Sequence, residues 1–182
     1  MNIEHYYTND KTELIFHHIF NKSLKNIKLS ENLQSISFGH NYNQPIESIK
    51  FPKHLISITF GFNFNKSFYS LPYSITTLNI SNTNNIHTIS DSIKNICFMF
   101  NANNIDMIDN LPNIITQINL EKCYFHDIPI INNLPASVTT IKINYYNDYF
   151  NDIDIMDNII KIPYGCKIID EHNKNITPKK LK

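Results

Sequence analysis

The sequence of 182 residues has no arginine, no tryptophan and only three glycines. The glycines stand far apart, at Gly39, Gly61 and Gly165, so the chain has no glycine-rich loop of the kind that cradles a phosphate. Enzymes built on a parallel β-helix place paired carboxylates beside a lysine or arginine. Six aspartates of this chain instead stand in segments predicted as turns, where aspartate is common for local reasons. They are Asp106, Asp109, Asp127, Asp152, Asp154 and Asp157. We therefore expect no catalytic site, and a carbohydrate-active β-helix enzyme is kept only as an alternative.

Cysteine is also scarce, and Cys97, Cys123 and Cys166 are odd in number and have no CxxC spacing. Such a set favours neither a disulfide framework nor a zinc site, and it is typical of a reducing compartment. The first ten residues contain no apolar signal-peptide core, and no apolar run reaches the length of a membrane helix. The formal net charge is zero, so no long-range field favours nucleic acid. These absences predict a cytoplasmic protein that binds neither a membrane nor nucleic acid.

What the sequence does contain is a repeat. The segment LQSISFG at residues 33–39 recurs as LISITFG at residues 55–61, 22 residues later. A ten-residue block starts at positions 29, 51, 71, 89, 111, 134 and 162, in steps of 22, 20, 18, 22, 23 and 28 residues. A period of about 20–30 residues is the signature of a solenoid. The longest step contains residues 144–158, which we interpret as a bulged loop because surface backbone tolerates insertions.

Each block predicts one short strand. Apolar residues occupy its first, fifth, eighth and tenth positions, and the last two alternate as they would on one face of a strand. Five of the eight prolines stand at the second position, where we expect them to start the strand without removing a ladder donor. The residues after each strand show no helical stripe and should return by turns or 3₁₀ segments. The expected fold is mainly β, a leucine-rich-repeat-like solenoid of parallel strands with about seven to eight coils. A sandwich of hairpins is the alternative, and the lack of Asn-Gly and Asp-Gly turns counts against it.

The repeat divides the chain into three expected parts. They are an N-terminal cap at residues 1–12, the repeat solenoid at residues 13–171 and a C-terminal tail at residues 172–182. Unprotected end strands would let coils stack between chains. A structural protein that assembles end to end is therefore an alternative function, and the oligomeric state is left open.

The strand residues that flank the inward eighth position should point outward, onto the concave face with which solenoids bind partners. They are small, polar and nearly uncharged: Ser35, Ser37, Ser57, Thr59, Thr77, Asn79, Asn95, Cys97, Gln117, Asn119, Thr140 and Lys142. A solvated face of stacked serines and threonines without a partner is an equal alternative. Tyr145, Tyr146 and Tyr149 on the long loop are candidate anchors for a partner, or else they fill the end of the core.

Two further columns follow from the period of 22 residues. Asn21, Asn43 and Asn65 share one column, where stacked side chains could satisfy backbone groups of the turns. His18 and His40 share another, but no third ligand stands near them. We therefore expect no metal site and no cofactor.

Several segments resemble the FNIP repeat, a divergent relative of leucine-rich repeats. The resemblance covers roughly residues 13–171 and rests on two kinds of motif. The LPxSITxL-like motifs are LPYSITTL at 71–78 and LPASVTTI at 134–141, and the FNxxI-like motifs are GHNYNQPI at 39–46, FGFNFNKSF at 60–68 and, shifted, YFNDI at 149–153.

The resemblance implies a protein–protein interaction scaffold. FNIP proteins are known mainly from slime moulds and from giant DNA viruses of amoebae, and some carry an F-box that links them to ubiquitin ligases. The residues before the first repeat are too few for an F-box, which puts a ubiquitin-ligase role in doubt. The expected function is a non-enzymatic scaffold, an adaptor acting on host proteins in the case of a virus, whose protein partner the sequence does not name.

Overall fold

The computed structural model describes residues 1–81, 84–99, 108, 111–121, 131–144, 159–178 and 181. The chain forms two compact units, Met1–Ile93 and Lys94–Lys182. Across the described residues, no helix is long and apolar enough to cross a lipid bilayer.

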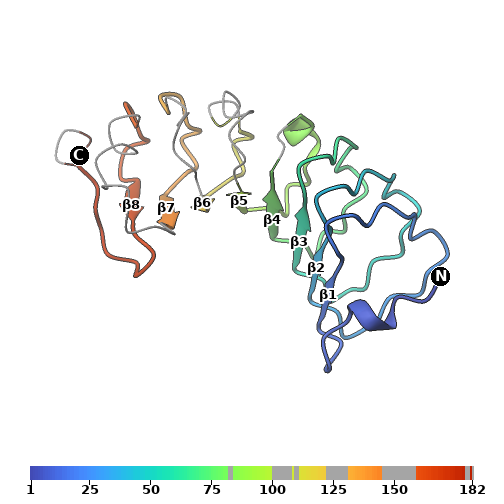
Figure 1. The fold of residues 1–182 in the computed structure, drawn as a ribbon. Helices are drawn as coiled ribbons and strands as arrows, with labels where there is room; N and C mark the ends of the chain where they lie inside the picture. The colour runs from blue at the N-terminus through green and yellow to red at the C-terminus, as the bar shows by residue number, and fades with distance from the viewer. Residues whose placement is uncertain are drawn as a thin grey trace. The chain divides into compact units, whose positions relative to one another are not determined.

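The first unit contains four short strands that pair in parallel and in chain order (Figure 1). Its elements are η1 (Glu4–Tyr6), β1 (Glu13–Ile15), β2 (Ser35–Ser37), β3 (Ser57–Phe60), β4 (Thr77–Ile80) and η2 (Ile86–Thr88). In register across the four strands lie Leu14, Ile36, Ile58 and Leu78. All four side chains are fully buried, as the repeat predicts for the eighth position of each block.

The second unit follows the same plan. Its strands are β5 (Asn95–Met99), β6 (Gln117–Glu121), β7 (Thr140–Asn144) and β8 (Lys167–Ile169), again parallel and in chain order. Ile96, Ile118, Ile141 and Ile168 lie in register and are fully buried. The prediction of a mainly β solenoid of parallel strands is confirmed.

The chain returns from one strand to the next by tight turns. In the coil that follows β2, the N–H of Tyr42 donates to the carbonyl of Gly39 at 3.2 Å, and that of Ile49 donates to the carbonyl of Ile46 at 3.0 Å. A third turn closes with a bond of 3.3 Å from the N–H of Leu55 to the carbonyl of Pro52. Each bond spans three residues, as in a β-turn or a 3₁₀ turn. This agrees with the expected return without a full helix.

The prolines of the repeat lie in the last of these turns and not at the start of the strand. The carbonyl of each accepts a hydrogen bond from the N–H three residues later, at 3.0–3.3 Å, in Pro52, Pro72, Pro112, Pro135 and Pro163. The following strand begins four or five residues after the proline. The prediction that proline starts the strand was wrong, because proline is the first residue of a turn that uses only its carbonyl group.

The core of the first unit contains two columns of stacked aromatic rings. Phe38 lies between Phe16 and Phe60, with ring centroids 5.5 and 5.2 Å apart and nearly parallel planes. Beside it, Tyr42 lies between Phe20 and Phe64 at 6.1 and 6.2 Å. The two columns also stack on each other, with 4.0 Å between the rings of Phe38 and Tyr42. Each coil therefore contributes a pair of rings to a continuous core.

Tyr42 is the one tyrosine in these columns, and its hydroxyl is buried without a hydrogen-bond partner among the described residues. Burial, aided by the Glu47 carboxylate, raises the pKa of Tyr42. Tyr42→Phe is therefore expected to raise the free energy of unfolding by about 1 kcal/mol or more, because it removes an unsatisfied buried group. Urea unfolding measures the change. Phe64→Tyr, which adds a hydroxyl at the equivalent position, should shift stability in the opposite direction, and a stabilising Phe64→Tyr would contradict this account.

Candidate interaction face of the sheet

The outward side chains of the first unit form two registered columns. The first contains Glu13, Ser35, Ser57 and Thr77, and the second contains Ile15, Ser37, Thr59 and Asn79. The serines, the threonines and Asn79 are all half-buried, while the alternate residues of the same strands are buried. The structure thus brings together six of the residues that the sequence analysis assigned to a partner-binding face.

A third column, which the sequence analysis missed, precedes each strand. The N–H groups of Ile56 and Ser57 both donate to the carbonyl of Gln34, at 2.9 and 3.1 Å. The same pairing of two successive N–H groups with one carbonyl joins Thr76 and Thr77 to Ile56. It breaks the alternation at the strand entry, so that two adjacent side chains face outward. The third column contains Thr12, Gln34, Ile56 and Thr76, and the polar residues at three of these positions were the available signal.

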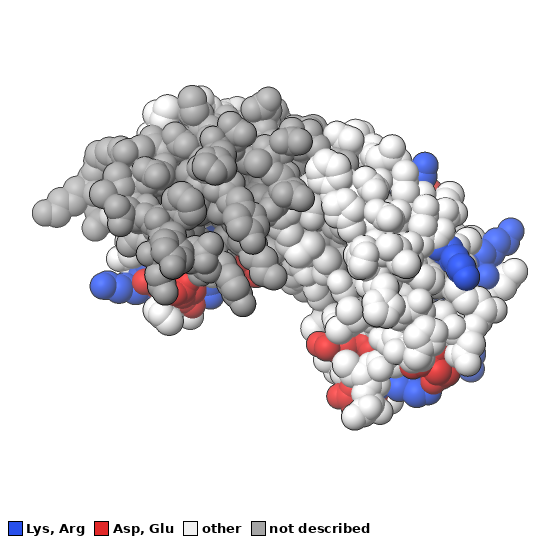
Figure 2. All heavy atoms as spheres, viewed as in Figure 1, with Lys and Arg blue, Asp and Glu red and all other residues white. Residues whose placement is uncertain are grey.

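We call these three columns the unit 1 sheet face. Glu13 is its only charged residue. Two of its side chains are apolar and well exposed, Ile15 at 53% and Ile56 at 50%. Beside Ile56 lies an open pocket of about 500 Å³, lined by Thr12, Asn32, Gln34, His54 and Ile56. Figure 2 shows, on the side of the unit turned to the viewer, charged side chains at the margins and an uncharged area between them.

Some of the polar side chains donate hydrogen bonds to the preceding coil. The amide nitrogen of Asn79 donates to the hydroxyl oxygen of Thr59 at 2.9 Å. In the second unit, the hydroxyl of Thr139 donates to the carbonyl of Thr116 at 3.2 Å, and that of Ser137 to the carbonyl of Ile115 at 2.7 Å. These bonds are the ladders expected for a face that only stabilises the stack. Thr59 and Asn79 of the unit 1 sheet face therefore bond neighbouring coils to each other, a structural role that is separate from any binding role.

The outward residues of the second unit behave alike, with one exception. Asn95, Gln117, Asn119, Thr140 and Lys142 are half-buried or exposed, and Lys142 donates to the side-chain oxygen of Asn173 at 3.1 Å. Cys97 lies in register with Asn119 and Lys142, as predicted, but its side chain is only 3% exposed.

The asparagine column stabilises the turns, as the sequence analysis proposed. The side-chain oxygen of Asn21 accepts a hydrogen bond from the backbone N–H of Asn43 at 3.0 Å. The side-chain oxygen of Asn43 accepts one from the N–H of Asn65 at the same distance. Asn85 extends the column, because its amide nitrogen donates to the carbonyl of Asn65 at 2.8 Å. Each coil is thereby bonded to the next outside the sheet.

The other candidate residues, which are histidines, cysteines, aspartates and loop tyrosines, form no reactive or metal-binding site in the part of the chain that the structure describes. The His40 ring stacks on Phe62 at 5.5 Å, and among the described residues no group of three or more His, Cys, Asp or Glu could hold a metal ion. Burial raises the pKa of the Cys166 thiol to about 11, so this thiol stays protonated at neutral pH. The remaining candidates lie outside the described residues: Cys123, the loop tyrosines Tyr145, Tyr146 and Tyr149, and the aspartates Asp106, Asp109, Asp127, Asp152, Asp154 and Asp157.

The aromatic and asparagine columns overlap a segment that matches a family model. Residues 20–63 match the FNIP repeat. The identification of FNIP repeats from the sequence motifs is confirmed over this segment, which contains Phe38, Tyr42 and the glycine at 39. No curated protein sequence matches the chain.

The fold also has a similar solved structure. It is CroV588, described as a novel circular LRR protein and derived from a giant virus, with a TM-score of 0.54 and 26% sequence identity. The similarity covers 93% of this chain and 26% of CroV588, so the chain spans about a quarter of that protein's length. FNIP repeats thus stand, in this chain, within a fold similar to that of a leucine-rich-repeat protein.

Proposed function

We propose that this chain is a non-enzymatic scaffold that binds another protein through the unit 1 sheet face. The observation that carries the proposal is the exposure of Ile15 and Ile56 among registered small, uncharged side chains. Two half-exposed isoleucines add apolar area to a face that is otherwise easy to desolvate, because it has a single carboxylate and no lysine. The open pocket beside Ile56 could accept one side chain of the partner.

The family likeness supports a protein partner and an absence of catalysis, since repeat solenoids bind other proteins along their extended faces. The proposal includes a cytoplasmic setting, and a host protein as the partner if the chain is viral. The outward residues of the second unit, from Asn95 to Lys142, and the tyrosines of the long loop are secondary candidates for contact.

The test compares two lysine variants by quantitative affinity purification from the cells that express the protein. The face variant carries Ile56→Lys, Ser57→Lys and Thr77→Lys. The control carries Ser48→Lys and Tyr69→Lys, at exposed positions in the turns. A partner recovered with the wild type and the control should bind the purified face variant about tenfold more weakly or worse, because charges enter a desolvated contact. A partner that binds the face variant as well as the wild type contradicts the proposed face.

A further inference from the structure

The two outermost strands of the described sheet, β1 and β8, are edge strands. An edge strand exposes backbone N–H and C=O groups to which another strand can add. In β1 the groups that point away from β2 belong to Glu13 and Ile15, and in β8 those that point away from β7 belong to Ile168. The N–H and C=O of Glu13 and of Ile168 are bonded within the chain.

The edge of β1 is closed by a hairpin of residues 7–14, the first hairpin. The N–H of Thr8 donates to the carbonyl of Glu13 at 3.0 Å, and the N–H of Glu13 donates to the hydroxyl oxygen of Thr8 at 3.2 Å. Tyr7 forms an antiparallel bridge with Leu14. The turn is held by Asp10, whose carboxylate accepts bonds from the Thr8 hydroxyl and from the N–H and hydroxyl of Thr12. These bonds lower the pKa of Asp10.

The edge of β8 is closed by a hairpin of residues 168–177, the second hairpin. The N–H of Ile176 donates to the carbonyl of Ile168 at 2.9 Å, and the N–H of Ile168 donates to the hydroxyl oxygen of Thr177 at 2.7 Å. Ile169 and Asn175 form an antiparallel bridge. The turn is again held by an aspartate, because the carboxylate of Asp170 accepts bonds from the N–H groups at 172 and 174.

The two hairpins share one design although their sequences differ. In each, a threonine hydroxyl accepts the hydrogen bond of the outward N–H, a backbone N–H donates to the outward carbonyl, and an aspartate organises the turn. Each turn also contains one residue in the left-handed region, Lys11 at φ 58° and Asn173 at φ 63°. The hairpins interrupt the parallel ladder, because the N–H and C=O of Glu13 and of Ile168 are already bonded within the chain when another strand approaches.

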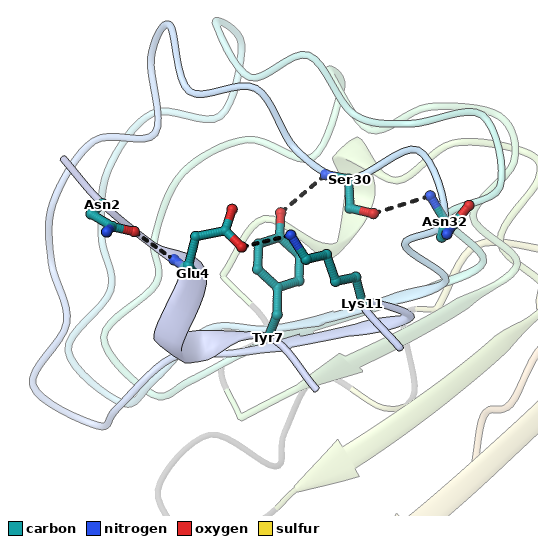
Figure 3. Close-up of polar contacts among 6 residues, drawn as sticks. All are labelled: Asn2, Glu4, Tyr7, Lys11, Ser30 and Asn32. Atoms are coloured by element: carbon teal, nitrogen blue, oxygen red, sulfur yellow. Dashed lines mark hydrogen bonds and ion pairs between the residues drawn. The ribbon is translucent and has the colours of Figure 1, made fainter. Parts of the chain in front are cut away.

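The first hairpin is anchored more firmly than the second. The hydroxyl oxygen of Tyr7 accepts a hydrogen bond from the N–H of Ser30 at 3.0 Å, and Lys11 and Glu4 form an ion pair at 2.6 Å (Figure 3). Ile3, just before it, is 4% exposed. In the part of the second hairpin that follows β8, the most buried side chain is Thr177, at 9% exposed, and residues 171–175 are exposed. The edge of β8 is therefore the one that a small change opens first.

We propose that the two hairpins are plugs that stop a second copy of this chain from adding a strand to either edge. The protein then remains a monomer, and it meets partners with the faces of its coils and not with the ends of its sheet. This opposes the alternative function considered from the sequence, end-to-end stacking of coils between chains. Residues 1–12 and 172–182 would thereby flank the repeat body at 13–171 as protective segments.

The test opens the second hairpin in the full chain. Ile176→Pro removes the N–H that meets the carbonyl of Ile168, and Thr177→Val removes the hydroxyl that meets its N–H. Light scattering coupled to size exclusion should show the wild type as a monomer of 21.3 kDa at high micromolar concentration. The doubly substituted variant should form a dimer and no larger species, because two β8 edges can pair about a two-fold axis while both β1 edges stay closed. Ile176→Val with Thr177→Ser, which keeps both bonds, is the matched control and should stay monomeric.

Two further readouts decide between outcomes. At low concentration the Ile168 amide should exchange its hydrogen about 100-fold faster in the opened variant than in the wild type, and protection should return on dimerisation. Adding Thr8→Pro, which removes both the N–H and the hydroxyl that meet Glu13, together with Asp10→Ala opens the β1 edge as well and should allow assemblies longer than a dimer. A folded variant with a rapidly exchanging Ile168 amide that stays monomeric overturns the proposal, as does end-to-end association of the wild type. If circular dichroism shows that the double variant unfolds, Thr177→Val alone is judged by the same two readouts. None of them involves a partner, so the result is independent of the proposed binding face.

Discussion

Phe38→Ala is expected to lower the free energy of unfolding by about 3–5 kcal/mol, the usual cost of removing a buried phenylalanine. Phe38 is 2% exposed, and its ring is stacked on three others: Phe16 at 5.5 Å, Phe60 at 5.2 Å and Tyr42 at 4.0 Å. The cavity would lie in the middle of both aromatic columns. Because the neighbouring rings are fixed by their own coils, they are poorly placed to collapse into it. Urea unfolding followed by circular dichroism gives the loss.

The matched control is the neighbouring residue of the same coil. Ser37 is half-buried on the outward face, so Ser37→Ala should change the free energy of unfolding by no more than about 0.5 kcal/mol. Equal losses in Phe38→Ala and Ser37→Ala would mean that the inward and outward sides of β2 are assigned the wrong way round. Phe60→Ala, at 1% exposure in the next coil, should behave as Phe38→Ala does.

The inward residues could be predicted from the sequence because two periods agree on them. An alternation of two residues within the strand and a step of about 22 residues between strands both place Ile36, Ile58 and Leu78 inside, and all three are buried. Because the same pattern of apolar residues recurs in several coils, it identifies the inward positions even in a chain that is rich in asparagine and isoleucine. The step of 22 residues alone made the asparagine column predictable from Asn21, Asn43 and Asn65, which lie outside the strands.

The features that the sequence did not reveal are those that depart from a period. The third outward column exists because two N–H groups converge on one carbonyl, as those of Ile56 and Ser57 do on Gln34, and strict alternation has no place for that geometry. Cys97 is buried although the serine and the threonine at equivalent positions are only half-buried, a difference that the pattern of positions does not predict. The threonines that close the sheet edges, Thr8 and Thr177, stand outside the repeats and have no counterpart within them.

Gly39→Ala is expected to be at least as damaging as the loss of a buried ring, at about 3 kcal/mol or more, because it drives backbone against backbone. A Cβ atom on Gly39 would lie 2.0 Å from the carbonyl oxygen of His17 and 2.7 Å from the Cα of His18. These are main-chain atoms of the preceding coil, so no side-chain rotation relieves the contact. The two coils would have to separate at the point where the rings of Phe38 and Phe16 stack. Urea unfolding should show the loss.

Gly165→Ala is the control that separates two causes of a loss of stability, a clash between coils and a strained backbone. Gly165 adopts φ +77°, and a Cβ atom there would meet no other atom within 4 Å. Gly165→Ala should therefore cost only the strain of a left-handed backbone, about 1–2 kcal/mol. If close approach between coils is what the FNIP repeat requires of its glycine, Gly39→Ala must be the more damaging of the two, and Gly61→Ala must resemble it, because a Cβ atom on Gly61 would lie 2.6 Å from the Cα of His40. A larger loss for Gly165→Ala would show that backbone conformation, and not the spacing between coils, sets the need for glycine in this chain.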